Sequence, residues 1–513
     1  MKRRLSVFAT LALLALSLPA LAETFVVTRN DDPAPNGCLP GDCSLREALA
    51  SANANANTDT IQVPPGQFGL PRGGLVITGS VTISGSFDPA TDVEGNGEFP
   101  VFDIKGAINV NLSNLRLRAH GAHAVNAEAE THTILGGIRI PDSDSQVWVG
   151  ESYNSGGSLD IDSSDIHAYV DCGNIALCRV TDSTLLRLQA GSGSNSLIDV
   201  EIALSLIDGA NGDSGAVVQT NGSVSITDTT IRDTSIGLLF VSGSPSQVSL
   251  DHLTYSGNRG PLDVRVQSPI SLIDSEFSGN VNDDINGGPG AIHASGGSNW
   301  QIANSSFIGN TGNGDVGGAV LVEKDADVAI RNSTFSANTF SAGSAAGARG
   351  ATIGYIADDG VISVSLAHVT IVPAAFAPVG ILGSALGGIG GDSFHLNLDV
   401  INSIVRGTCS LDTGAMDINL GNIESPGDTC QFNPNYNLVD VTSGALGLGT
   451  LGDHGGATRT YVPGAASVAI DQANALECLD TDQRGYQRPF GNGCDVGAVE
   501  RGAEDRVFAD GFD

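Results

Sequence analysis

The chain of 513 residues is acidic and rich in glycine: it contains 57 aspartate and glutamate residues, 24 lysine and arginine residues, and 67 glycines. The net charge of −33 disfavours nucleic acid as a partner, because phosphate backbones are bound by concentrated positive charge. Hydrophobic residues still make up 41% of the chain, which indicates a turn-rich β protein rather than a disordered one.

The first 22 residues have the pattern of a secretory signal peptide. Basic residues 2–4 precede an apolar run at 7–18, and Ala20-Leu-Ala22 supplies the small residues of a cleavage site. A membrane anchor is the alternative, but the apolar run is shorter than the ~20 residues needed to span a bilayer. Cleavage after Ala22 leaves 21 basic and 57 acidic residues, a net charge of −36. We therefore predict an exported protein, extracellular or on the cell surface, and not a transmembrane one.

Residues 23–58 are predicted to form an N-terminal cap. An extended segment at 24–28 is followed by Cys43-Ser-Leu-Arg-Glu-Ala-Leu49, in which Ser44 and Glu47 fit the capping box of a short helix. Arg46 and Glu47 could also be a catalytic pair, but we interpret them as parts of the cap. The stretch resembles the CSLREA motif, which occurs near the mature N-terminus of exported bacterial β-helix proteins.

A six-residue phrase recurs between residues 112 and 405, within the predicted β-helix of residues 59–406. Its first position is aliphatic, its third is Asp, Asn or His, and its fourth is usually Ser or Thr. The sixth position is aromatic or aliphatic, and the second and fifth can be any residue. Clear copies begin at 226, 250, 272, 302 and 330, and further copies at 112, 161, 180, 197, 366 and 400. The spacing marks a stacked solenoid, since one short coil cannot bury its apolar face alone. The gap between 112 and 161 predicts one coil with a degenerate phrase, and about a dozen coils fit between 112 and 405.

Stacking in parallel register would align like residues into ladders along the solenoid. The first inner ladder is predicted to contain Ile226, Leu250, Leu272, Ile302, Ile330, Leu366 and Val400. A second contains Ile231, Tyr255, Phe277, Phe307, Phe335, Ile371 and Val405, and a third, at a turn, contains Asn258, Asn280, Asn310 and Asn338. The predicted fold is all-β: a right-handed parallel β-helix with a short N-terminal capping helix and a C-terminal cap domain. Its opening coils, 59–66 and 75–85, resemble those of pectin-lyase-like β-helices.

Residues 407–500 are predicted to be a separate C-terminal region. Five blocks at 451–459, 463–471, 482–485, 488–489 and 494–500 resemble, in this order, the choice-of-anchor Q domain. In that family the domain follows β-helix repeats and precedes a surface anchor. The remaining tail, 501–513, has neither an apolar span nor a sortase-type motif. Its 507–512 segment resembles a short terminal sequence of exported gamma-proteobacterial proteins, and this resemblance implies a Gram-negative bacterium as the source.

Eight cysteines in an exported chain predict disulfides. Proximity in the sequence favours four local pairs: Cys38 with Cys43, Cys172 with Cys178, Cys409 with Cys430, and Cys478 with Cys494. Zinc binding is the alternative, but none of these pairs has C-x-x-C spacing.

Candidate catalytic groups are Asp283-Asp284, Asp358-Asp359 and His454-Gly-Gly456. Paired carboxylates could act on a glycosidic bond or hold Ca²⁺. The first pair, however, lies in a glycine- and asparagine-rich turn, and the polygalacturonase motifs and a lyase arginine cluster are absent from the sequence. We predict no catalytic residue and no cofactor, with Ca²⁺ as an option. Convergence of three or more charged side chains in one outer groove would instead favour an enzyme.

The expected partner is an extracellular glycan or a surface protein. Outer positions are rich in Ser, Thr, Asn and Asp, and Trp148, Tyr153, Tyr255 and Trp300 could stack on sugars, although Tyr255 falls on an inner ladder. His252 and His368 occupy the Asp/Asn/His position of the phrase and are interpreted as turn residues. The predicted function is that of a non-catalytic adhesion or binding protein, and the alternative is a polysaccharide lyase or glycoside hydrolase.

Overall fold

The computed structural model describes residues 21–503 except for short internal segments. These segments are residues 129, 151–155, 192–195, 210–214, 236, 241–244, 266, 285–286, 315–316, 342–349, 358–359, 375–383, 390–395 and 412–415. The predicted signal peptide, except residues 21 and 22, and residues 504–513 lie outside the described residues.

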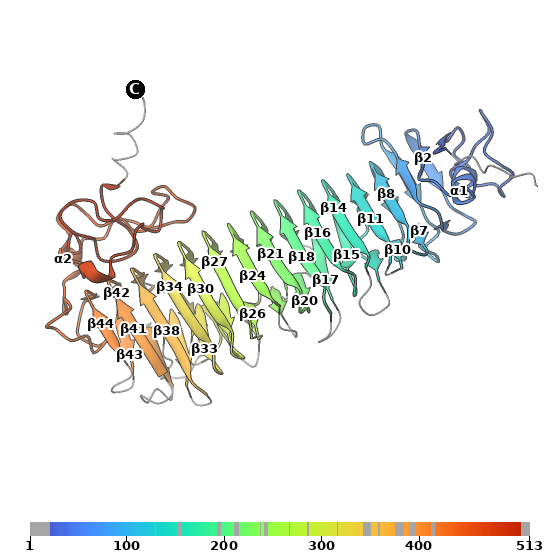
Figure 1. Cartoon of the computed structure of the whole chain (residues 1–513). Helices are drawn as coiled ribbons and strands as arrows, with labels where there is room; N and C mark the ends of the chain where they lie inside the picture. Colours follow the sequence, from blue (N-terminus) through green and yellow to red (C-terminus); the bar gives the residue numbers. More distant parts are fainter. Residues whose placement is uncertain are drawn as a thin grey trace, which may run out of the picture.

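Parallel strands wind into one elongated rod (Figure 1). In the described residues, the first face is a 16-stranded sheet. Its strands are β1 (Thr24–Val26), β2 (Asp59–Gln62), β5 (Val81–Ser84), β8 (Asn109–Ser113), β11 (His132–Gly136), β14 (Ser158–Asp162), β16 (Leu177–Thr181), β18 (Asp199–Ala203), β21 (Ser223–Thr227), β24 (Gln247–Asp251), β27 (Pro269–Ile273), β30 (Asn299–Ala303), β34 (Asp327–Arg331), β38 (Ile362–Ala367), β41 (Leu396–Ile401) and β44 (Ile418–Leu420).

The second face follows the first after a two-residue turn in most coils. Its strands are β3 (Gly66–Gly69), β6 (Thr91–Glu94), β9 (Leu115–Arg118), β12 (Arg139–Ile140), β15 (Asp165–Asp171), β17 (Thr184–Ala190), β19 (Leu206–Asp208), β22 (Thr230–Arg232), β25 (Thr254–Ser256), β28 (Glu276–Ser278), β31 (Ser306–Ile308), β35 (Thr334–Ser336), β39 (Thr370–Val372), β42 (Ile404–Arg406) and β45 (Ile423–Ser425).

The third face joins the second through the long strands β15 and β17. Its other strands are β4 (Leu75–Ile77), β7 (Phe102–Ile104), β10 (His123–Ala127), β13 (Gln146–Val149), β20 (Gly215–Val218), β23 (Leu238–Phe240), β26 (Leu262–Val264), β29 (Ile292–Ala294), β33 (Val320–Glu323), β37 (Ile353–Ile356), β40 (Ser384–Ile389) and β43 (Thr408–Ser410). A small separate sheet pairs β32 (Thr311–Gly312) with β36 (Thr339–Phe340).

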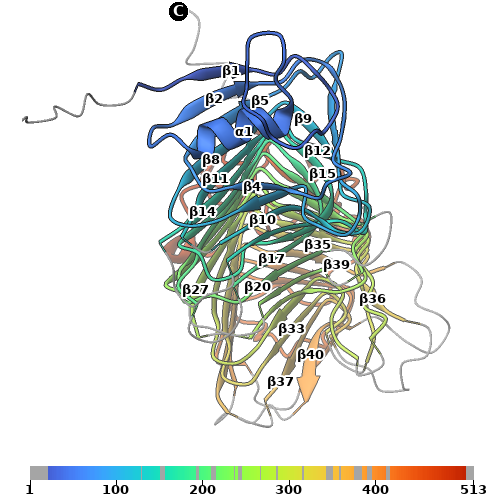
Figure 2. The same ribbon diagram turned by 90° about the vertical axis from the view of Figure 1, so that its right-hand side faces the viewer.

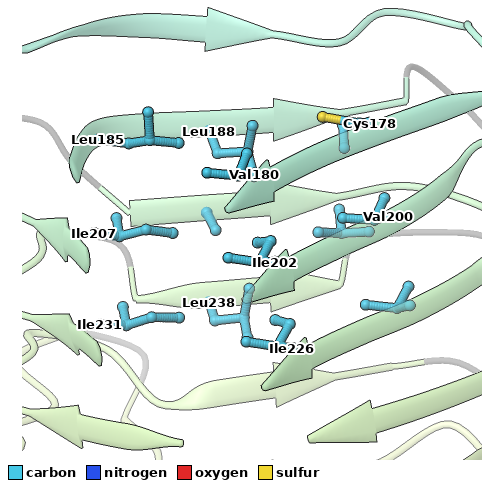
Figure 3. Close-up of a cluster of buried hydrophobic side chains, with 14 of the residues drawn as sticks. Cys178, Val180, Leu185, Leu188, Val200, Ile202, Ile207, Ile226, Ile231 and Leu238 are labelled. Atoms are coloured by element: carbon cyan, nitrogen blue, oxygen red, sulfur yellow. The ribbon is translucent and has the colours of Figure 1, made fainter. Parts of the chain in front are cut away.

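The predicted ladders are present in the register of these strands. Ile226 pairs with Leu250 and Leu250 with Leu272, and the ladder continues to Val400. The second ladder runs through the stacked rings of Phe277, Phe307 and Phe335, whose centroids are 5.1 and 4.6 Å apart. Side chains from all three faces fill the interior (Figure 3), so each coil buries its apolar residues against the next. Both inner ladders and the parallel β-helix are thereby confirmed.

The third residue of the phrase adopts a left-handed backbone conformation. It forms a turn ladder, which contains Asn114, Gly137, Ser163, Asp182, Leu204, Asp228, His252, Asp274, Asn304, Asn332, His368 and Asn402, all with φ between 44° and 63°. Asn, Asp and Gly tolerate this conformation better than other residues, which explains the composition of the phrase. His252 and His368 are therefore turn residues, as predicted.

One copy of the phrase was misplaced by the sequence pattern. The predicted copy at 197 is out of register, because Ile202 is the residue that pairs with Val180 and with Ile226. The true copy, 202–207, has Leu204 at the turn position with φ of 51°. A leucine there does not match the Asp, Asn or His of the pattern. The degenerate coil lies at 135–140, where Gly137 occupies the turn.

Helix α1 (Leu45–Asn53) closes the N-terminal end of the rod (Figure 2). The predicted capping box is present: the Ser44 N–H donates to Glu47 Oε2 at 2.8 Å, and the Glu47 N–H donates to Ser44 Oγ at 3.3 Å. Arg46 instead binds Asp32 and the carbonyls of Gly73 and Gly74. Arg46 and Glu47 thus have separate structural partners.

The stacked strands extend past the predicted limits of 59 and 406, since β1 pairs with β2 and β45 pairs with β42. Twelve strands of the first face, β8 to β41, lie between residues 109 and 401 in the described chain, in agreement with the predicted dozen coils. All four predicted cysteine pairs are disulfides, with Cα separations of 4.4, 6.0, 4.7 and 6.2 Å. Among the described residues, no helix has the length and apolar character needed to cross a membrane.

The C-terminal region, 426–503, is an irregular layer with only a short helix α2 (Ser443–Leu446) and a 3-10 turn, η1 (Ala475–Glu477). It packs beside the last coils (Figure 1) and covers part of the turn ladder. Thr458 donates to the Asn304 carbonyl, Asn332 donates to the Thr481 carbonyl, and Asn402 donates to the Glu477 carbonyl. The C-terminal region therefore covers the turn ladder from Asn304 onward.

Buried ion pairs organise this region. Asp482 accepts from the Arg484 guanidinium at 2.8 Å, and Arg488 donates to Glu500 at 3.1 Å. The side chains of all four residues are at most 1% exposed, so each charge needs its partner. These residues come from the sequence blocks at 482–485, 488–489 and 494–500.

Candidate functional site

The predicted catalytic groups do not form a site in the described structure. Asp283 is exposed and pairs with exposed Arg259 at 3.2 Å, while the Asp284 N–H donates to Asn282 Oδ1 as part of a turn. His454 is half-buried and its Nε2 lies 3.1 Å from the Thr450 carbonyl. Asp358 and Asp359 lie outside the described residues.

A charged cluster that the sequence did not reveal lies on the third face. Asp263 pairs in register with His293, and its carboxylate lies 3.3 Å from His293 Nδ1. The other imidazole nitrogen, Nε2, lies 3.2 Å from Glu323. Arg265 binds Asp263 at 2.6 Å, and Lys324 binds Glu323 at 2.9 Å. Five charged side chains thus converge here. This number exceeds the three charged side chains whose convergence would favour an enzyme.

The protonation states of this cluster do not suit acid–base catalysis. Burial disfavours the charged imidazole, but Asp263 and Glu323 outweigh it and raise the pKa of His293 to about 9. The hydrogen bond from His293 is the main cause that lowers the pKa of Glu323 to about 2. A catalytic group works best with a pKa near the working pH, and here every charge already has a partner. The cluster is better explained as an ion-pair network that joins three coils.

An aromatic face lies further toward the N-terminus, on the outside of β10, β13, β15 and β17. We define it as Asn126, Trp148, Tyr169, Asp171, Arg187 and Gln189. Strand register places Asn126, Trp148, Asp171 and Gln189 in one column across four consecutive coils. Their alternation with fully buried neighbours such as Val147 and Val170 turns them outward. All six are half-buried.

The polar groups of the aromatic face are held in place by one another. The Tyr169 hydroxyl donates to Gln189 Oε1 at 2.5 Å, and the Arg187 guanidinium lies 4.8 Å from the centre of the Tyr169 ring. Burial raises the pKa of Tyr169 to about 12 and also raises the pKa of Asp171. Arg187 Nε is buried and has no hydrogen-bond partner among the described residues. The face therefore combines rings with donors and acceptors that are already oriented.

A hollow of about 340 Å³ adjoins this face. It is lined by Pro141, Ser143, His167, Thr184, Leu185, Leu186 and Asp208. His167 lies two residues before Tyr169 on β15, where the register with β17 shifts between Ile166 and Tyr169. The continuous strands β15 and β17 thus place the hollow and the aromatic face side by side.

Of the aromatic residues predicted to meet sugars, Trp148 alone is on an outer face within the described chain. Trp300 and Tyr255 are fully buried, and Trp300 donates its Nε1–H to Ser298 inside the rod. Tyr153 lies outside the described residues. Sequence reasoning missed Tyr169, although the alternation of the 165–171 segment marks it as outward-facing.

The carboxylate of the aromatic face, Asp171, lies too far from Asp103, the other carboxylate in its column, for glycoside hydrolysis. Asp103 and Asp171 share one column but are three strands apart, from Asp103 through Asn126 and Trp148. At ~4.8 Å per strand this is about 14 Å. Hydrolases hold their two carboxyl groups about 5–9.5 Å apart. This pair therefore lacks the hydrolase geometry.

The fold places the chain among the right-handed parallel β-helix proteins. No family model matches it, and no curated protein matches its sequence. The crystal structure of pectate lyase Pel9A aligns over 94% of this chain and 97% of that chain, with 11% sequence identity and a TM-score of 0.23. This weak likeness bears on neither ligand nor activity.

Proposed function

We propose that the protein is an exported, non-catalytic surface or secreted β-helix that binds a carbohydrate chain through the aromatic face. The observation that carries this proposal is the position of Trp148 and Tyr169 on neighbouring coils, among amide, carboxylate and guanidinium groups. Sugar rings present apolar faces and hydroxyl edges, so flat rings flanked by oriented hydrogen-bonding groups are complementary to them.

Charge favours a neutral glycan over a polyuronate. Asp103 and Asp171 flank Asn126 and Trp148 in the same column, and the net charge of −33 would repel an anionic polymer. Export is supported by the N-terminal sequence pattern and by the four disulfides, which persist in oxidising compartments. The resemblance to CSLREA and choice-of-anchor Q proteins is consistent with a role at the cell surface.

The test is a binding assay of the purified mature chain against cellulose, chitin, xylan, mannan and starch. Trp148→Ala and Tyr169→Ala should each weaken binding to the bound polysaccharide about tenfold, equivalent to about 1.4 kcal/mol. Tyr436→Ala is the matched control, because Tyr436 is 62% exposed but lies in the C-terminal region. Equal binding by all three variants, or no binding by the wild type, would count against the proposal.

A further inference from the structure

Two carboxylates and an imidazole meet on the exposed part of the turn ladder. Asp251 ends β24, His252 occupies the following turn, and Asp274 occupies the turn of the next coil. One ligand atom from each residue lies within 4.8 Å of the other two. His252 Nδ1 is 2.9 Å from Asp251 Oδ1.

The backbone brings these side chains together. His252 and Asp274 have φ of 52° and 50°, and their strands are in direct register through Leu250 and Leu272. Two side chains at the same position of adjacent coils are held ~4.8 Å apart by the sheet spacing. The geometry is therefore set by the solenoid and not by the side chains themselves.

Within the described residues, the only basic side chain paired with the carboxylates of this group is His252 itself. Several other carboxylates on the rod pair with a basic side chain, such as Asp92 with Arg116 and Asp208 with Arg232. Within the described residues, neither Asp251 nor Asp274 pairs with arginine or lysine. A bound cation would relieve the repulsion between the two carboxylates.

We propose that Asp251, His252 and Asp274 bind a divalent transition-metal ion of the Zn²⁺ type. Ca²⁺ and Mg²⁺ take oxygen ligands almost exclusively, whereas an imidazole nitrogen suits Zn²⁺, Cu²⁺ or Ni²⁺. With bonds of ~2.0–2.2 Å, two ligands of one Zn²⁺ lie at most about 4.4 Å apart, so small side-chain rotations complete the site. Three protein ligands leave a position for water or for a group from a partner.

The experiment is a calorimetric titration of the metal-stripped mature chain with Zn²⁺. One site is expected, and His252→Asn and Asp274→Asn should each lower its affinity at least tenfold. Asparagine keeps the left-handed turn, because it occupies the same position at Asn304 and Asn332. The matched control is His120→Asn: His120 has φ of 52°, and its imidazole Nε2 lies 3.0 Å from the Glu94 carboxylate.

Each result decides the proposal. Loss of the site in both test variants but not in the control supports it, and Co²⁺ binding should give a visible absorption band that disappears in His252→Asn. Unchanged Zn²⁺ affinity in His252→Asn, no saturable site in the wild type, or tighter binding of Ca²⁺ than of Zn²⁺ would overturn it. Circular dichroism checks that each variant is folded, and Asp251→Asn replaces any variant that is not.

Discussion

The side-chain amide of Asn280 donates a hydrogen bond of 2.8 Å to Asn310 Oδ1 in the next coil, and both asparagines are fully buried. The same bond links Asn258 to Asn280 at 3.1 Å and Asn310 to Asn338 at 3.0 Å. Each amide also donates to a backbone carbonyl, as Asn310 does to Phe277. This asparagine ladder satisfies buried backbone groups at a bend of the coil where no strand partner is available.

Replacement of Asn310 with alanine should destabilise the rod by about 3 kcal/mol, because the donors of Asn280 and the acceptors of Phe277 and Asn338 lose a partner. Urea denaturation measures this loss. Asn397→Ala is the control: Asn397 is exposed and donates only a 3.3 Å bond to Ser363, so we expect less than about 0.5 kcal/mol. Similar losses in the two variants would contradict a structural role for the ladder.

Stability should fall in mild alkali because of His293. Its pKa is raised from 6.5 to about 9 in the folded chain, so its contribution is complete below pH 6.5 and is lost as the pH rises through 9. At about 1.4 kcal/mol per pKa unit the contribution is on the order of 3 kcal/mol. Urea denaturation between pH 6 and 10 should show this slope in the wild type and a reduced slope in His293→Gln. If the free energy of unfolding depends on pH equally in the two proteins, the His293 cluster is not the cause of the alkaline loss of stability.

His368 should make the chain sensitive to acid. Burial, and then the charge of Arg488, lower its pKa from 6.5 to about 3. The folded state therefore favours the neutral imidazole: the stability contributed by His368 is complete above pH 6.5 and falls, as the pH drops toward 3, by about 1.4 kcal/mol per unit. His368→Asn keeps the turn conformation and should flatten the profile between pH 6.5 and 4. An unchanged acid profile in this variant would refute the assignment.

The substitution Gln483→Ala should loosen the contact between the C-terminal region and the coils of the rod. Gln483 accepts from the Thr334 hydroxyl at 2.6 Å and donates to Thr458 at 2.9 Å, and only 1% of it is exposed. Loss of these bonds should cost about 2 kcal/mol. Hydrogen exchange is expected to accelerate in 426–503 while the coils before residue 270 keep their protection. Gln472→Ala, at an exposed glutamine of the same region, serves as the control.

The mature chain should release no product from pectin, polygalacturonate or alginate, with or without Ca²⁺. Asp283 and Asp284 lie in a turn, and each charged group of the His293 cluster is paired with an opposite charge. Product above a heat-killed control would argue for an enzyme. Its abolition by Glu323→Gln, by Asp283 and Asp284 to Asn, or by Asp358 and Asp359 to Asn would identify the site.

Repetition made the fold readable from the sequence. The phrase is short, each copy faces the same neighbours in the next coil, and a parallel stack has one consistent register, so the ladders through Ile226, Phe277 and Asn280 follow from alignment alone. The cysteine pairs and the α1 cap were equally local, because their partners lie 3 to 21 residues apart. The copy of the phrase at 202–207 was missed because Leu204 occupies a turn position that usually takes Asp, Asn or His.

Only the tertiary structure showed which outward side chains meet. Trp148, Tyr169 and Gln189 become neighbours because coils of different lengths stack in register, and loop lengths between strands do not reveal which outward residues align. The same holds for Asp263, His293 and Glu323, and for the docking of Gln483 on Thr334 across 149 residues. The inward half of each strand obeys the periodic burial of apolar residues, which the sequence records directly. The outward half has no such constraint, so its chemistry emerged only when the coils were placed side by side.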